Sequence, residues 1–453
     1  MKPVQGLTDE QRFPLLKDRR LLEKLRQDEA GPIFNFGSGD RLDAAALKRV
    51  TDYSLTLADK EFWHENEQPF WLPDYLGWCK TTVEAYRGCS LVLADNPTLR
   101  REQIARRPWQ FVSSDARIAE MLVFCTSGTT GAPMDILVDP VSQATWIPQL
   151  ESILGQKNIK IERGSDKVAI CLICHQQETL TYASLSTWLD GAGILKINLN
   201  PKDWKKPQDR LTYLERYNPE VITGDPFTFM ALAQLNPAIR PKAMVSSAMT
   251  LHEGLRQLLQ KQFKCPVYDL YSLTECRMIA VSEKPGIYQL IRPELYVEIL
   301  HPGRDEAVAP GARGEITVTG GINPFLPLIR YRTGDFASLQ FVAGQPYLIN
   351  LEGRSPTLFL SQKRDFINHV DISRALSSFS LAGFTLHQKK DLSLDFSAWG
   401  TGVSEENLRD ALSELFGKDI EMRVNLAKEI LNETKKVKYS SEINETDLQP
   451  CQR

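Results

Sequence analysis

The sequence predicts an α/β protein with a large N-terminal layered domain, residues 1–352, and a small C-terminal α+β domain, residues 353–453, joined by a hinge. Three observations lead to this prediction. The chain has 453 residues, which is more than one domain usually holds. From about residue 110, short apolar segments alternate with amphipathic ones, as in layered α/β folds. After Gly353 the pattern changes again.

Each part of the large domain has its own local pattern. The first ~100 residues resemble helices, and Thr8 with Gln11 forms a capping-box pattern. Residues 255–263 have helical periodicity between two apolar segments. Residues of alternating or continuous apolar character predict strands at 135–138, 168–174, 221–222, 243–245, 266–268, 296–300 and 314–319. The last two of these give the large domain a strand-rich subdomain.

The C-terminal segment predicts a small mixed domain. A helix is expected over residues 372–379, and a second helix should begin after Ser404 and end at Gly417. The apolar face of this second helix consists of Leu408, Leu412, Leu415 and Phe416. Strands are expected at residues 384–387, 392–396 and 420–426.

Composition and charge exclude several classes of partner. The net charge is −3 and no long basic run occurs, so we expect no nucleic-acid partner. No run of 18 apolar residues and no apolar N-terminal leader segment occur, so we expect a cytoplasmic protein without a membrane partner. The eight scattered cysteines are typical of free thiols. Cys171, Cys174 and His175 match the spacing of a haem attachment site, but the surrounding apolar run favours a buried strand.

The most informative segment is a loop rich in glycine and hydroxyl side chains. It follows an apolar strand and contains Thr126, Ser127, Gly128, Thr129, Thr130 and Gly131. Glycines let backbone N–H groups turn inward and hydroxyls add donors, which is the chemistry of a phosphate cradle. The loop lacks the Gly-Lys-Ser/Thr of a Walker A motif. Taken alone, the pattern also fits a polar hairpin.

This loop, through Pro133, resembles the phosphate-binding signature of the adenylate-forming superfamily, which includes acyl- and aryl-CoA ligases, peptide-synthetase adenylation domains and luciferases. Members usually carry a lysine after the proline, and this sequence has Met134 instead, which removes one cation. Phenylacetate–CoA ligase-like members also tolerate another residue there. The resemblance is therefore to that branch.

Further motifs follow in the order that the superfamily shows. Residues 269–275 resemble its Tyr-Gly-x-Thr-Glu motif, and residues 331–335 resemble its Tyr-Arg-Thr-Gly-Asp motif. Residues 353–354 resemble its Gly-Arg hinge, although Pro356 departs from the usual pattern and predicts a stiffer hinge. Residues 246–248 resemble its adenine-binding strand and turn.

The resemblance implies a role for each of these positions. Thr130, Glu275 and Lys436 are the expected catalytic residues, and Glu275 would hold Mg²⁺. Lys436 lies in the charged run of residues 432–438, where Lys435 and Lys438 remain candidates and a solvated charge run is the alternative. His175 and Ser272 are assigned to the acyl pocket. The nucleotide would contact Thr126, Ser127, Gly128, Thr129, Thr130, Gly131, Ser246, Ser247, Ala248, Asp269, Tyr271, Ser272, Thr274, Asp335 and Arg354.

The implied activity is ATP-dependent activation of an aryl or acyl carboxylic acid. Its adenylate would form with release of pyrophosphate, and the acyl group would then pass to a thiol, with coenzyme A as the expected acceptor. Two alternatives remain. One is an adenylating ligase that loads a carrier protein or forms an amide. The other is a non-catalytic nucleotide-binding relative, which the departures at Met134, Ser272 and Pro356 keep open.

Overall fold

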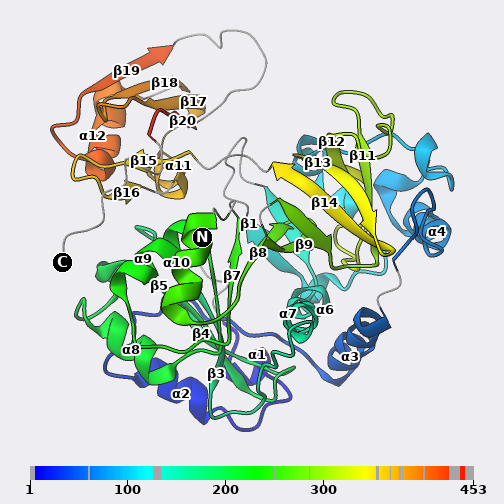
Figure 1. Ribbon diagram of the computed structural model, residues 1–453, viewed down its shortest axis with the longest axis horizontal. Helices are drawn as coiled ribbons and strands as arrows, with labels where there is room; N and C mark the ends of the chain where they lie inside the picture. Colours follow the sequence, from blue (N-terminus) through cyan, green and yellow to red (C-terminus); the bar gives the residue numbers. More distant parts are fainter. Residues whose placement is uncertain are drawn as a thin grey trace. The chain divides into compact units, whose positions relative to one another are not determined.

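The computed structural model divides into two compact units (Figure 1). The larger comprises Met1–Phe124, Asp135–His175 and Leu180–Arg354, and the smaller comprises Cys125–Met134, Gln176–Thr179 and Ser355–Arg453. The structure describes residues 6–59, 62–125, 134–248, 251, 253–284, 286–352, 357–367, 369–376, 379, 381–400, 403–427 and 439–443.

A twelve-stranded sheet runs through the larger unit, in the order β11-β12-β13-β14-β10-β9-β8-β7-β6-β3-β5-β4. Its first strands along the chain are β3 (Val168–Cys174), β4 (Tyr182–Ser186), β5 (Ala192–Asn198), β6 (Val221–Gly224), β7 (Ala243–Ser247) and β8 (Val267–Leu273). Those that follow are β9 (Arg277–Lys284), β10 (Ile287–Leu290), β11 (Leu295–Leu300), β12 (Gly314–Gly320), β13 (Leu328–Val342) and β14 (Gln345–Glu352). A separate two-stranded sheet pairs β1 (Leu122–Cys125) with β2 (Asp135–Val138).

The direction of pairing divides the large sheet into two parts. Strands β5, β3, β6, β7 and β8 pair in parallel, whereas β4 and every strand from β9 onward pair antiparallel. The β8–β9 hairpin joins the two parts, so the turn after β8 lies where the layered α/β part meets the strand-rich part. This architecture confirms the predicted fold class.

Apolar side chains bury both faces of the parallel strands. On one face, Leu22, Tyr213 and Phe229 pack in a cluster with strand residues such as Cys171. On the other, Leu150 packs with its helix neighbours against the opposite strand face. Strands covered on both faces need near-continuous apolar runs, which is why residues 168–174 contain no charged side chain.

Several of the helices of the larger unit supply these covering layers (Figure 1). Those before the sheet are α1 (Asp9–Arg12), α2 (Arg20–Gln27), α3 (Ala44–Asp59), α4 (Leu72–Thr82) and α5 (Arg101–Arg106). Those interleaved with the sheet are α6 (Pro140–Ala144), α7 (Trp146–Gly155), α8 (Asp209–Tyr217), α9 (Pro226–Leu235) and α10 (Glu253–Phe263). The capping box predicted at Thr8 and Gln11 is confirmed at the start of α1. Among the described helices, none combines the length and the apolar character that crossing a membrane requires.

The smaller unit has a four-stranded sheet of order β19-β18-β17-β20 around its own apolar cluster. Its elements are β15 (Phe359–Leu360), β16 (Phe366–Ile367), α11 (His369–Leu376), β17 (Leu381–Gln388), β18 (Leu394–Gly400), α12 (Glu405–Phe416), β19 (Met422–Ala427) and β20 (Tyr439–Ser441). As predicted, Ser404 caps α12, with its hydroxyl accepting from the N–H of Asn407 at 3.1 Å. The helix predicted at 372–379 is α11, displaced toward the N-terminus. Phe379 packs on the same cluster from outside the helix. Because this residue is apolar, the sequence pattern predicted a helix that continued to it.

Candidate active site

Several predicted site residues gather at one edge of the large sheet. Strands β3, β6, β7 and β8 are parallel, so their carboxyl ends lie at the same edge, where α/β proteins commonly bind ligands. His175 follows β3, Ser246 and Ser247 end β7, and Ser272 lies near the end of β8. Ala248 has φ of +70°, a left-handed conformation that turns the chain sharply as it leaves β7.

A buried hydrogen bond links the two motifs of residues 269–275 and 331–335. The hydroxyl of Tyr271 donates to Oδ2 of Asp335 at 2.9 Å, across 64 residues of sequence. Burial, and then the charge of Asp335, raises the pKa of Tyr271 well above its usual value, so the phenol remains a donor. The N–H of Asp335 donates to Oγ1 of Thr333 at 3.1 Å, and this hydroxyl donates to the carbonyl of Ile316 at 2.9 Å. Asp335 is therefore held from two sides.

A second hydrogen bond links the same two motifs, with the donor now in residues 331–335 and the acceptor in residues 269–275. The hydroxyl of Tyr331 donates to Oε1 of Glu275 at 2.7 Å, and Arg101 approaches the same oxygen at 3.4 Å. Burial, and then the charge of Glu275, raises the pKa of Tyr331. Glu275 is only 8% exposed. Each motif therefore supplies one carboxylate and one phenol, and the phenol of each motif donates to the carboxylate of the other. These two hydrogen bonds fix β13 against the end of β8.

The residues around Glu275 fit a magnesium ion that is bound mainly by phosphate. Mg²⁺ bound with nucleotides typically takes one or two carboxylates, with phosphate oxygens and water completing its shell. Within the described ranges, no group of three or more His, Cys, Asp or Glu side chains is placed to hold a metal ion. Glu275, a single buried carboxylate, matches the first pattern.

Two other predicted residues are buried among protein groups. Oδ2 of Asp269 accepts from the hydroxyl of Tyr288 at 2.5 Å and from the N–H of Leu251 at 3.2 Å. This carboxylate therefore joins β8 to β10 and to the segment before α10. The hydroxyl of Ser246 is fully buried and has no hydrogen-bond partner in the part of the chain that the structure describes. Thr274 is half-buried in the turn between β8 and β9.

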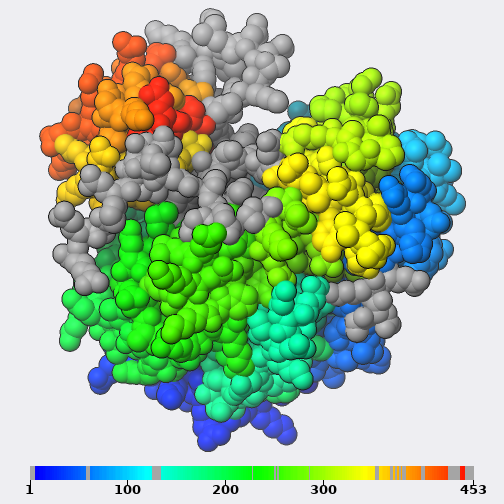
Figure 2. All heavy atoms as spheres, in the orientation of Figure 1, coloured from blue at the N-terminus to red at the C-terminus, as the bar shows by residue number. Residues whose placement is uncertain are grey.

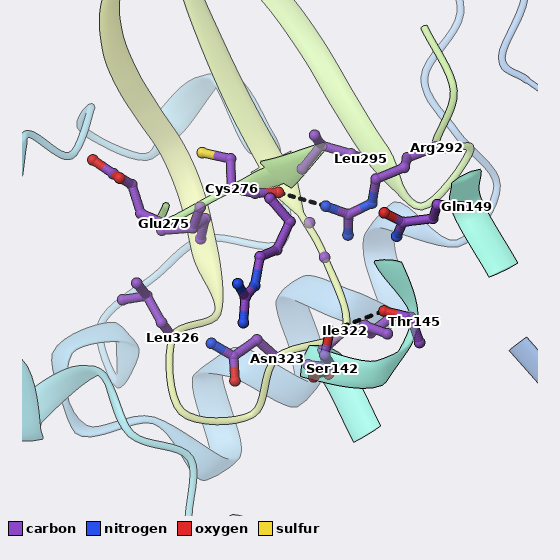
Figure 3. Close-up of a pocket in the computed structure, with 14 residues that line it drawn as sticks. Ser142, Thr145, Gln149, Glu275, Cys276, Arg292, Leu295, Ile322, Asn323 and Leu326 are labelled. Carbon is purple, nitrogen blue, oxygen red and sulfur yellow. Dashed lines mark hydrogen bonds between the residues drawn. The ribbon is translucent and has the colours of Figure 1, made fainter. Parts of the chain in front are cut away.

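Beside Glu275 lies a cavity of about 20 Å³ with polar and apolar lining residues, enough for a single water molecule (Figure 3). Its wall consists of Ser142, Thr145, Gln149, Glu275, Cys276, Arg277, Arg292, Leu295, Gly320, Gly321, Ile322, Asn323, Leu326 and Leu328. Arg292 is paired with Glu294 at 2.7 Å and donates to the carbonyl of Cys276. Gln149 donates to the hydroxyl of Tyr53 at 2.8 Å, while its buried Oε1 has no partner among the described residues.

Arg277 contributes the other guanidinium of this cavity. It donates to Oε1 of Gln143 and lies over the ring of Phe124, 5.1 Å from its centroid. Its backbone φ is +65°, in the left-handed region that a bulky residue rarely adopts. Burial, and then the positive charge of Arg292, lowers the pKa of Arg277 to about 10.

The remaining predicted site residues lie outside the described ranges. These are Thr126, Ser127, Gly128, Thr129, Thr130, Gly131, Arg354, Lys435, Lys436 and Lys438. Their roles stay predictions. Met134, where the superfamily usually has lysine, is described and is 2% exposed.

Sequence reasoning missed three residues at this site. Tyr331 belongs to a quoted motif, but its partner Glu275 is 56 residues away. Arg101 lies in α5, where no motif occurs, 174 residues before its partner. Arg277 follows Glu275 by two positions, and that proximity was the one available signal.

Comparison with known proteins identifies the family. The family model for AMP-binding enzymes matches residues 87–323, just over half of the chain. The protein belongs to this family. Protein CapK of Staphylococcus aureus is 23% identical over 175 residues, which cover 36% of this chain and only 37% of CapK.

Solved structures also match the fold. A 2-hydroxyisobutyryl-CoA ligase in complex with 2-HIB-AMP and CoA, in its thioesterification state, aligns with a TM-score of 0.52 at 16% identity, covering 88% of this chain and 90% of the ligase. The same ligase in its postadenylation state aligns with a TM-score of 0.47 at 15% identity, covering 88% and 89%. At this identity the first alignment supports a common fold.

Proposed function

We propose that this protein activates a carboxylic acid with ATP as its acyl-adenylate and transfers the acyl group to a thiol, with coenzyme A as the acceptor. One observation carries the proposal: Tyr271 donates to Asp335 while Tyr331 donates to Glu275. Two motifs far apart in sequence thus place two buried carboxylates at the carboxyl edge of the sheet, in a chain of the AMP-binding family. A ribose and a metal-bound phosphate chain need two such carboxylates.

The chemistry follows from position and charge. A carboxylate oxygen of the acid attacks the α-phosphorus of ATP, the bond to the bridging oxygen breaks, and pyrophosphate leaves. Asp335 accepts from the ribose hydroxyls, and Ser247 and Tyr271 border the adenine. Bound Mg²⁺ would neutralise phosphate charge, with Glu275 as its protein ligand. Thr130 and its neighbours in the loop would donate to the phosphates.

Lys436 is proposed as the cation that bridges the attacking carboxylate and the α-phosphate. Charge develops there in the transition state, where a positioned ammonium lowers the barrier most. Lys436→Ala should lower adenylation by about 100-fold or more, within the range that removing such a contact costs. Lys435→Ala is the matched control and should stay near wild type. The reverse result would move the role to Lys435.

The branch and substrate class belong to the same proposal. The sequence around Met134 supports a phenylacetate–CoA ligase-like acid–thiol ligase that acts on an aryl or acyl acid.

The test of the proposed function is carboxylate-dependent exchange of pyrophosphate into ATP, across aryl, fatty and amino acids and without coenzyme A. Exchange with one class of acid identifies the substrate. The acceptor is then found by adding coenzyme A, a phosphopantetheinylated carrier protein or an amine and identifying the product by mass spectrometry.

Two results would contradict this function. If a thioester forms only on a carrier protein, the acceptor is the carrier protein and not coenzyme A. If the product is an amide, the acceptor is an amine. Absence of exchange with every acid, in a protein that binds ATP, would indicate the non-catalytic relative.

A further inference from the structure

A groove of about 600 Å³ lies in the N-terminal part of the larger unit. Its wall is made by residues 31–37 together with Arg12 of α1, Arg26 of α2, Asp28 and Lys205. None of these residues lines the cavity beside Glu275. The volume falls within the range of about 300–1,000 Å³ that small-molecule sites occupy. The groove is therefore a candidate binding site apart from the candidate active site.

The floor of this groove is a segment that the rest of the unit holds in place. The N–H of Ile33 donates to the carbonyl of Asp203 at 2.8 Å. The N–H groups of Asn35 and Phe36 donate to the carbonyl of Thr181, just before the edge strand β4, at 3.2 and 3.1 Å. Because the backbone is fixed at both points, the groove is formed before any ligand binds.

Arg12 is packed directly against the end of this floor. A Cβ atom at Gly37 or at Gly39 would collide with the side chain of Arg12, so both positions need glycine. The carbonyl of Arg12 also accepts from the N–H of Arg41 at 2.9 Å. The two glycines therefore let a guanidinium lie at the wall of the groove.

The carboxylates at the groove already have basic partners. Arg12 and Arg26 both pair with Asp9, at 3.0 and 2.6 Å, so one carboxylate serves two guanidiniums. Asp28, which lines the groove, pairs with Arg216 of α8. Neither carboxylate is left over to neutralise a further cation.

Two further cations have no carboxylate partner in the described ranges. Lys205 donates to a backbone carbonyl at 3.2 Å. Arg41 is half-buried, and burial, followed by the positive charge of Arg12, lowers its pKa. Its neighbour Asp40 accepts from Thr187 instead. Since unpaired cations held close together repel each other, this part of the unit favours an anionic ligand.

The rest of the wall is apolar. Ile33 is 58% exposed, and the rings of Phe34 and Phe36 are half-buried. Phe36 packs against Tyr182 with 6.1 Å between the ring centroids, which leaves the wall firm. A ligand that fills the groove would therefore gain from an apolar body as well as from its charge.

We propose that this groove binds a small phosphate monoester with an apolar body. A phosphate monoester carries a charge of about −1.5 to −2 at pH 7, so it neutralises more of the positive charge around Arg12, Arg41 and Lys205 than a carboxylate does. Guanidinium and ammonium groups also form strong charge-assisted hydrogen bonds with phosphate oxygens. The apolar body lies along Ile33 and Phe34.

The test measures the binding of phenyl phosphate to the full-length protein by isothermal titration calorimetry. Wild type should bind phenyl phosphate more tightly than inorganic phosphate. The double variant Arg41→Met with Lys205→Met should lose about 10- to 100-fold in affinity for phenyl phosphate, the usual loss for a charge-assisted hydrogen bond. The variant should fold, because neither side chain has a described carboxylate partner and the repulsion between Arg41 and Arg12 is relieved.

Two further variants separate the parts of the ligand. Ile33→Ser should weaken phenyl phosphate by several-fold, on the order of the loss of one apolar contact, and leave inorganic phosphate unchanged. Lys206→Met is the matched control, because Lys206 is an exposed lysine next to Lys205 that does not line the groove. It should bind phenyl phosphate like wild type.

Three outcomes would overturn the inference. Wild type that does not bind phenyl phosphate would show that the groove does not take this class of ligand. Affinity that the double variant leaves unchanged, or that Lys206→Met lowers equally, would place phenyl phosphate elsewhere on the protein. Inorganic phosphate that binds as tightly as phenyl phosphate would show that the apolar wall contributes nothing.

Discussion

At the scale of single residues, the site depends on hydrogen bonds between side chains far apart in sequence. Tyr331 and Tyr271 each place a phenol on a buried carboxylate of the other motif. These contacts hold Glu275 and Asp335 in fixed positions before any ligand binds. In the proposed reaction, such preorganisation would lower the cost of ordering the candidate site.

Tyr331→Phe tests this positioning. The variant removes the hydrogen bond to Glu275 at 2.7 Å, and we expect a loss of about 1–3 kcal/mol in the free energy of unfolding, as for other bonds to charged groups. Pyrophosphate exchange should fall by about tenfold, because the carboxylate is held less firmly. Denaturant unfolding and exchange kinetics measure the two effects. Tyr347→Phe, at a half-buried tyrosine of β14, is the control, and an equal effect there would contradict the account.

At the scale of secondary-structure elements, the carboxyl edge of β3, β6, β7 and β8 brings the site together. Parallel pairing makes their ends coincide, and the β8–β9 turn adds Glu275 and Arg277. The smaller unit is stabilised by its own elements. Helix α12 buries Leu408, Leu412 and Phe416 in that unit's core and begins at the cap of Ser404.

Ser404→Ala tests the cap of α12. Removing the hydroxyl leaves the N–H of Asn407 without its acceptor, and helix caps of this kind contribute about 1 kcal/mol. We expect the smaller unit to unfold at lower denaturant concentration by that amount. Ser413→Ala, inside the same helix, should leave stability unchanged or slightly raised, since alanine favours helix interiors. Equal destabilisation by both changes would contradict the capping role.

Periodicity made the fold class predictable, whereas the roles that motif order assigned to the candidate site residues stay predictions. Apolar runs at residues 168–174 and 243–245 predicted strands because strands covered on both faces must be apolar. The order of the strands in the sheet could not be predicted from the sequence, because tertiary packing determines which strands pair, as for β3 and β6. Arg101 escaped prediction for a related reason: its ion pair with Glu275 spans 174 residues, and no local pattern records it.

At the scale of the whole molecule, partly buried hydrogen bonds connect the N-terminal region to the sheet. Asp40 accepts from the N–H and hydroxyl of Thr187, which follows β4, at 2.6 and 2.9 Å. Burial raises the pKa of Asp40 to about 6 from its usual 3.8, despite these hydrogen bonds. The folded protein therefore holds this proton more tightly than the unfolded chain.

This shift predicts a pH dependence of stability. Between about pH 4 and pH 6 the folded state binds more protons at Asp40 than the unfolded state, so this contribution is present at low pH and is lost as pH rises. Relative to Asp40→Asn, the wild-type free energy of unfolding should fall across this window by on the order of 1 kcal/mol. Denaturant titrations of both proteins at matched pH values measure it. Parallel pH profiles would contradict the raised pKa.

The central claim is that Glu275 and its neighbours at the end of β8 support adenylation of a carboxylic acid. It is tested most directly by acid-dependent pyrophosphate exchange in wild type, in Glu275→Gln and in Glu283→Gln, an exposed glutamate of β9. The account predicts exchange in wild type with one class of acid, a loss of about 100-fold or more in Glu275→Gln, and no change in Glu283→Gln. Exchange that persists undiminished in Glu275→Gln would contradict it.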